Sequence, residues 1–331
     1  MTRTAVNSRD HKRFRRTRSP GFDPTYGDRP LAAALEDLRL GRWQGPRELL
    51  RGTRHDWDRR THRIRLLAQT AAGSRTVESW QIAEPHDTDA LALRADTDVM
   101  RLFCALAQAP PQTQRPPDRD AFDRNRLHHA ARSCFRAADA CPADPMPWIS
   151  LLTLSRLYGG GHPDTGLWWA ELRARDRNSR EGHHQMLRHV SARWHGSHGR
   201  MYDFARDVAV AAPPGSPLAV LTQAARVEHY RELIRTEGRA SLGLSFHWTH
   251  EAVAPDLDAT LARWIAHRAP VEYAQDVADL NLLAHGLVFA GRINDATSVF
   301  HHLGDRPTAV PWSYCGDPRA LFTQSRKQAL A

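Results

Sequence analysis

The spacing of apolar side chains between residues 280 and 307 constrains the fold more than any other feature of this chain. Bulky residues return at helical spacing, and after one glycine a second helical run carries an alanine and, one turn later, a phenylalanine. Gly291 suits the turn between two helices, Asn294 can cap the second helix through its side chain, and Gly304 can end it in the left-handed conformation. The stretch therefore predicts two apposed helices. The pattern is carried by Leu280, Leu283, Ala284, Leu287, Ala296, Phe300 and Pro307.

These spacings resemble the tetratricopeptide-repeat (TPR) pattern, in which Trp-x-x-Leu-Gly-x-x-Tyr is followed by Ala-x-x-x-Phe and Pro. Leu280 stands in place of the Trp, Ala284 in place of the Gly and Leu287 in place of the Tyr. Degenerate copies of the second half begin at Ala131 and Met201. The resemblance implies an all-α fold, an α-α superhelix of about fourteen helices arranged as TPR-like hairpins. No extended Val/Ile/Thr alternation predicts a sheet.

Proline and glycine divide the chain into predicted units. Residues 1–29 lack hydrophobic periodicity and predict a disordered basic arm. Four prolines fall within 109–118, and proline neither donates a backbone hydrogen bond nor favours helix before it, so this stretch predicts a linker. We therefore expect a smaller N-terminal helical lobe over 30–108 and a TPR-like repeat domain over 119–331.

The net charge of +9 is concentrated at the N-terminus. Residues 1–19 hold seven basic side chains against Asp10, which leaves only +3 for the rest of the chain. A body with nearly balanced charge lacks the broad basic face that phosphate binding needs. We therefore expect at most a weak nucleic-acid contact, made through residues 1–19.

The sequence gives no sign of export or of membrane insertion. Arg15 and Arg16 are not followed by the apolar run of a twin-arginine signal, and the longest apolar stretch is too short to cross a bilayer. The four cysteines form no Cys-x-x-Cys pair, which argues against a disulfide framework or a cysteine zinc site. A soluble, cytoplasmic protein that contacts no membrane is expected.

A second resemblance lies between residues 186 and 206. The run is similar to the central pattern of uncharacterised bacterial proteins with a DUF4034-type domain, roughly Pro-Arg-Trp-Gly-Gly-Ser, a short gap, Met, then Phe-Ala-Arg. Ala192 replaces the Pro and His195 replaces the first Gly. The resemblance implies helical, repeat-like architecture, and because no activity is assigned to the family it transfers no catalytic residue. It suggests a partner-binding groove near Arg193, Trp194, His195, Tyr202 and Arg206.

Histidines cluster between residues 183 and 198 and raise the possibility of a metal site. Glu181, His184 and Arg188 share one helical face, but the segment lacks the His-Glu-x-x-His spacing that places two imidazoles one turn apart around a general base. Asp58 and His62 are also one turn apart, yet no third ligand is evident. We therefore favour a polar helix surface for the histidine segment and a solvent-exposed pair for Asp58 and His62. No metal ligand, cofactor or catalytic residue is expected.

These observations favour a non-catalytic helical scaffold that recognises a partner protein. One alternative is a nucleic-acid-associated regulator that uses the basic arm. A less favoured alternative is a metal-dependent hydrolase, which requires convergence in space of four residues, Glu181, His183, His184 and His195.

Overall fold

A computed structural model of the chain describes residues 22–53, 55–108, 124–268 and 273–331. Within these ranges the protein forms sixteen α-helices and three short 3-10 helices and contains no strand, which confirms the all-α prediction. The α-helices are α1 (Arg29–Arg39), α2 (Gln44–Arg51), α3 (Trp57–Ala71), α4 (Thr76–Ala83), α5 (Thr88–Gln108), α6 (Arg124–Ala140), α7 (Met146–Ser155), α8 (Thr165–Arg175), α9 (Arg180–His189), α10 (His198–Ala211), α11 (Leu221–Glu237), α12 (Leu242–Phe246), α13 (Val253–Arg263), α14 (Asp276–Phe289), α15 (Ala296–Leu303) and α16 (Pro318–Ala329). The 3-10 helices are η2 (Pro217–Val220), η3 (Ile265–His267) and η4 (Trp312–Tyr314).

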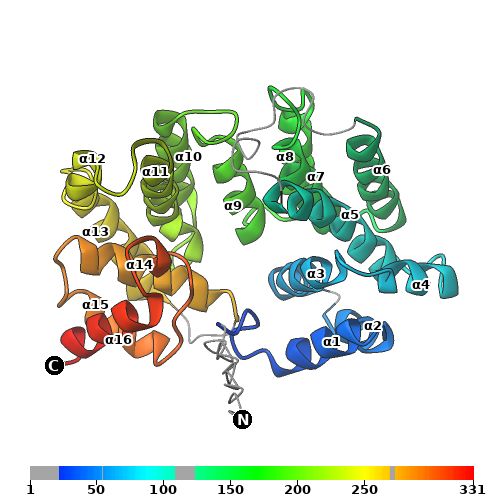
Figure 1. Ribbon diagram of the computed structural model, residues 1–331, viewed down its shortest axis with the longest axis horizontal. Coiled ribbons are helices and arrows are strands. Elements are labelled where there is room, and N and C mark those ends of the chain that lie inside the picture. Colours follow the sequence, from blue (N-terminus) through cyan, green and yellow to red (C-terminus); the bar gives the residue numbers. More distant parts are fainter. Residues whose placement is uncertain (1–21, 54, 109–123, 269–272) are drawn as a thin grey trace, which may run out of the picture.

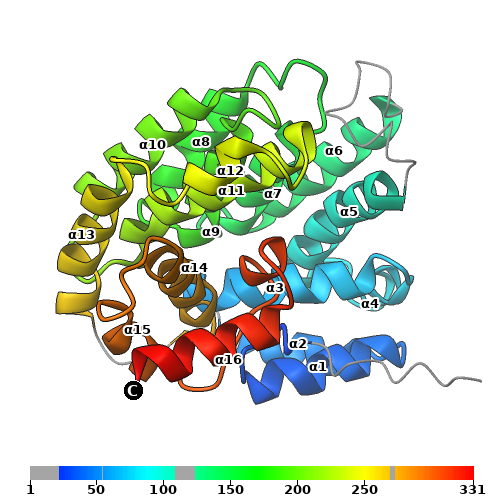
Figure 2. The same cartoon turned by 60° about the vertical axis from the view of Figure 1, so that its left-hand side comes forward.

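Neighbouring helices pack against one another in a curved, superhelical array (Figure 1). The chain runs from α1–α4 through α5–α11 to α14–α16, and the first and last groups lie on the same side of the molecule (Figures 1 and 2). Near the centre, the Gln275 side-chain nitrogen Nε2 donates to the backbone oxygen of Asp58 at 2.5 Å. This contact joins the turn before α14 to α3, so the two ends of the array meet.

The predicted hairpin at 280–303 is present as α14 packed against α15. All of its helical pattern residues are fully buried, from Leu280 to Phe300. Gly291 and Gly304 adopt φ values of 74° and 60°, which glycine reaches without steric cost. The prediction that Asn294 caps the second helix is wrong, because Asp295 occupies the N-cap position and no side chain caps that end.

A continuous core connects the elements on both sides of the predicted linker. Residues 109–123, and with them the linker, lie outside the described ranges, as do residues 1–21 of the predicted arm. Helices α5 and α6 flank this gap and pack directly together. One cluster of buried apolar side chains extends from Leu31 to Leu172. The division at 109–118 stays a prediction, while the packing of the described helices is continuous across it.

Buried ion pairs, as well as apolar contacts, hold the first half of the array together. Arg60 on α3 is only 3% exposed. Its guanidinium donates to Asp89 on α5 at 2.6 Å and to Asp144, just before α7, at 2.8 and 3.0 Å. Arg65, one turn further along α3, reaches the fully buried Asp96 at 2.9 Å. The arginines of α3 therefore join it to α5 and α7.

None of the described helices combines the length and the apolar character that crossing a bilayer requires.

Candidate functional site

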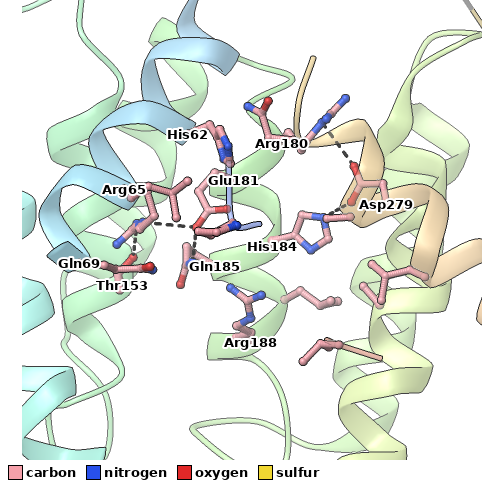
Figure 3. A pocket seen from close by; sticks show the side chains of 18 of the residues that line it. His62, Arg65, Gln69, Thr153, Arg180, Glu181, His184, Gln185, Arg188 and Asp279 are labelled. Carbon is pink, nitrogen blue, oxygen red and sulfur yellow. Dashed lines mark hydrogen bonds and ion pairs between the residues drawn. The ribbon is translucent and has the colours of Figure 1, made fainter. Parts of the chain in front are cut away.

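A pocket of about 620 Å³ lies at the centre of the curved array. Its walls come from α3, α5, α7, α9, α11 and α14, together with the turn that precedes α1. These elements are far apart in the sequence, so the pocket exists only because the array curves back on itself. Figure 3 shows charged and polar side chains pointing into this space from several helices.

Helix α9 supplies one wall of this central pocket. The Ser179 hydroxyl caps the helix by accepting from the backbone nitrogen of Gly182, which fixes where the helix begins. Glu181, His184 and Arg188 then follow at intervals of three and four residues and line the pocket together. The shared helical face expected from the sequence is confirmed, but it lines a pocket instead of an open helix surface.

Glu181 is held as a carboxylate within the pocket. Its Oε1 accepts a hydrogen bond of 2.5 Å from Gln185 and lies 3.5 Å from Nε of Arg65 (Figure 3). Burial raises the pKa of Glu181, but the nearby charges of Arg65 and Arg188 outweigh that effect and leave the pKa below its usual value. The pocket therefore contains a fixed negative charge.

The opposite wall belongs to α14 and carries a second group of paired charges. Arg180 donates to Oδ1 of Asp276 at 2.6 Å and lies 3.4 Å from Oδ2 of Asp279. The imidazole of His184 lies 3.4 Å from the other oxygen of Asp279 (Figure 3). These contacts position the side chains of α9 against α14.

Asp58 and His62 both line the pocket, so the prediction of a solvent-exposed pair is wrong. Burial raises the pKa of Asp58 to about 6, while the nearby Arg180 opposes the rise. Burial lowers the pKa of His62 to about 4, and its ring stacks on Tyr26 at 5.8 Å. The sequence pattern could not reveal this burial, because the helices that cover α3 come from distant parts of the chain.

Arg156, which follows α7, is the most unusual side chain of the pocket wall. It is 7% exposed. Its Nη2 donates to Gln185 at 2.8 Å and its Nε to the backbone oxygen of Thr153 at 3.4 Å. The ring centroids of Phe103 and Trp194 lie 4.8 and 5.2 Å from the guanidinium carbon. Burial, with the nearby cations Arg188 and Arg65, lowers the pKa of Arg156, although a guanidinium keeps its proton at neutral pH.

The five residues predicted to bind a partner do not line the central pocket. Three of them lie around Arg156. The ring of Trp194 makes a cation–π contact with the Arg156 guanidinium, and Nε2 of His195 lies 3.0 Å from the Arg156 backbone oxygen. Arg193 lies 5.9 Å from the Trp194 ring. This part of the predicted groove therefore lies directly behind the pocket wall.

The other two predicted residues lie further away, where α10 meets α11 and α13. The Tyr202 hydroxyl is 3.1 Å from Nδ1 of His229. Arg206 donates to both oxygens of Asp256 at 3.0 and 3.1 Å. The structure therefore separates the predicted set into two groups, and Arg156, the residue that connects the first group to the pocket, carries no motif in the sequence.

The residues named for a hydrolase are not brought together. Glu181 and His184 share the pocket, whereas His183 hydrogen bonds to the backbone oxygen of Ser179 at 2.7 Å and packs its ring on Trp169. His195 lies behind Arg156. In the part of the chain that the structure covers, no three His, Cys, Asp or Glu side chains are placed to hold a metal ion.

The chain was compared with protein-family models, with curated proteins and with solved structures. None of the three comparisons finds a match. The likeness to TPR repeats and to the DUF4034-type domain therefore stays a prediction based on the motifs described above.

Proposed function

We propose that this protein is a non-catalytic helical scaffold that recognises a partner protein by holding a segment of it in the central pocket. The observation that supports the proposal is the position of the pocket, on the inner side of an array whose six contributing helices converge there. Pockets that bind ligands combine apolar walls with a few polar groups in fixed positions, and this wall has both.

The charged groups of the wall are suited to orienting a ligand. Glu181 is fixed by Gln185 and Arg65, and His184 is fixed by Asp279. Side chains that are already held in place lose little conformational entropy when a ligand binds, which favours affinity.

A substitution that fills the pocket without removing a charge tests this proposal. Ala278 lines the pocket on α14, so Ala278→Phe places a ring in the cavity. Ala254→Phe adds the same ring at an exposed position on α13 and serves as the matched control. Peptides would be selected from a random display library on the unaltered protein, and their affinities for all three proteins measured by calorimetry.

We expect the selected peptides to bind Ala254→Phe as they bind the unaltered protein, and to bind Ala278→Phe at least about tenfold more weakly, a loss of about 1.4 kcal/mol. Urea unfolding midpoints confirm that both variants fold. Equal binding to Ala278→Phe, or failure of the library to yield any binder, contradicts recognition through this pocket.

A further inference from the structure

Arg156 is the one buried arginine of the described chain that lacks a carboxylate partner. Six arginines there are buried, and five of them have a carboxylate oxygen within 3.3 Å. The hydrogen bonds of Arg156 go instead to an amide oxygen and a backbone oxygen. A buried cation costs folding free energy unless an opposite charge compensates it. The position of Arg156 at the wall of a pocket therefore points to a negatively charged ligand that is not part of this chain. The five paired residues are Arg60, Arg63, Arg65, Arg180 and Arg226.

The surroundings of Arg156 leave one edge of the guanidinium available. Phe103 and Trp194 cover the group through cation–π contacts, which compensate part of the desolvation. Nε and Nη2 are used by Thr153 and Gln185, while Nη1 makes no hydrogen bond to any described residue. Since Arg156 lines the pocket, Nη1 is the donor left for a ligand there.

The neighbouring charges indicate how much negative charge the ligand carries. Arg65 is already paired with Asp96, and Arg188 lies 3.5 Å from Glu228. Glu181 lies 3.5 Å from Arg65, which leaves Arg156 as the cation of this group that has no carboxylate in contact. A ligand with one negative charge can pair with Arg156, whereas a doubly charged phosphate would be repelled more strongly by the nearby Glu181 and Glu228. A carboxylate fits this requirement, because it carries one negative charge and accepts a charge-assisted hydrogen bond from a guanidinium nitrogen.

The same region of the pocket is largely apolar. Met100, Phe103, Leu187 and Val227 line it together with Arg156. Apolar walls next to one fixed charge favour a ligand with an apolar body and a charged end.

We propose that the central pocket binds a carboxylate carried on an apolar body, and that Arg156 forms the ion pair with that carboxylate. This inference rests on the proposed use of the pocket for recognition and adds the chemical class of the group recognised. The carboxylate belongs either to a free small molecule or to an acidic side chain of a bound polypeptide segment.

The test uses two probes of the same shape and different charge, 4-phenylbutyrate and its amide, with the full-length protein and calorimetry. A charge-assisted hydrogen bond in a desolvated site is expected to favour the carboxylate by about tenfold or more. In Arg156→Met this preference disappears, while the weak binding of the amide is unchanged.

Arg175→Met is the matched control, because Arg175 also lies over a tryptophan ring, Trp148, at 4.8 Å but is outside the pocket. It should keep the preference for the carboxylate. Circular dichroism and urea unfolding establish that both variants fold.

The proposal is overturned if the two probes bind equally, if neither binds, or if Arg156→Met keeps the preference for the carboxylate. Replacing the acidic residues of pocket-binding peptides with the corresponding amides separates the two sources of the carboxylate. The peptides lose affinity if an acidic side chain supplies the carboxylate, and they keep it if the carboxylate belongs to a free small molecule. A third outcome separates the two proposals. If Ala278→Phe abolishes peptide binding, while Arg156→Met leaves peptide binding unchanged and the two probes bind equally, recognition through the pocket is supported and the role of Arg156 is rejected.

Discussion

The guanidinium of Arg180 donates a hydrogen bond of 2.6 Å to Oδ1 of Asp276, and this contact joins the start of α9 to the start of α14. Arg268 donates to the other oxygen of the same carboxylate at 2.8 Å. On the opposite side of α9, Glu181 lies 3.5 Å from Arg65 on α3. Helix α9 therefore connects the two ends of the array and separates the pocket from the helices behind it.

Replacing Arg60 with methionine should destabilise the protein strongly. The change leaves Asp89 and Asp144, both buried, without their cation, which costs about 3 to 5 kcal/mol. Arg39→Met removes an exposed pair with Glu36 and should cost less than about 1 kcal/mol. Urea unfolding followed by circular dichroism measures both, and a similar small loss for the two variants would show that the buried pairs contribute little.

Replacing Arg156 with methionine should change the stability of the protein only slightly. No carboxylate loses its partner, and an apolar side chain removes the free-energy cost of a buried cation. The expected change in the free energy of unfolding is between a loss of about 1 kcal/mol and a small gain. A loss as large as that of Arg60→Met, in the same urea experiment, would identify Arg156 as a mainly structural residue.

Gly196→Ala should destabilise the turn between α9 and α10. A Cβ atom at this position would lie 1.9 Å from the backbone oxygen of Val190, so the turn must shift. Overpacking of this kind costs about 3 kcal/mol. Gly199→Ala, where the nearest atom is the Ser197 hydroxyl at 3.9 Å, should be neutral or slightly stabilising. Thermal unfolding of the two variants makes the comparison, and equal midpoints would contradict the close approach at Gly196.

Stability should fall as the pH is lowered, in part because of His285. This side chain is 1% exposed among the rings of Trp248, Phe289 and Trp312. Burial lowers its pKa to about 3, compared with about 6.5 in the unfolded chain. The unfolded state therefore binds the proton first, so the stability contributed by neutral His285 is complete above pH 6.5 and decreases as the pH falls toward 3.

The expected contribution of His285 between pH 7 and pH 5 is a loss of about 2 kcal/mol. In His285→Leu the decrease in unfolding free energy over this interval should be smaller by that amount. His86→Leu, at an exposed position, should leave the decrease unchanged. Urea unfolding at both pH values decides the matter, and identical pH dependence in all three proteins would exclude His285 as a source.

The parts of the fold that depend on local spacing could be predicted from the sequence. Leu280, Leu283 and Leu287 return every turn, and glycines allow the chain to reverse, so the α14–α15 hairpin follows from residues within one short stretch. The prediction that Asn294 caps the second helix was wrong because the helix begins one residue later than expected, so that Asp295 occupies the N-cap position.

The candidate site could be predicted only in part. The face shared by Glu181, His184 and Arg188 follows from helical periodicity. Their surroundings do not, because the charged groups that contact them come from α3, α11 and α14, at least 40 residues away in the sequence. Arg156 has no local motif, and its importance lies in the absence of a carboxylate beside it, which only the three-dimensional arrangement reveals.

The arginine at position 60 also limits how this sequence can change over evolutionary time. Its Nε and Nη2 hold one carboxylate while Nη1 holds another, so a single planar group spans two helical segments. A lysine ammonium is a point charge and cannot reproduce that fork. Among the 46 basic residues only Lys12 and Lys327 are lysines. Where one buried guanidinium binds two carboxylates, as at Arg60, a change from arginine to lysine would lose these contacts, even though the two residues carry the same charge.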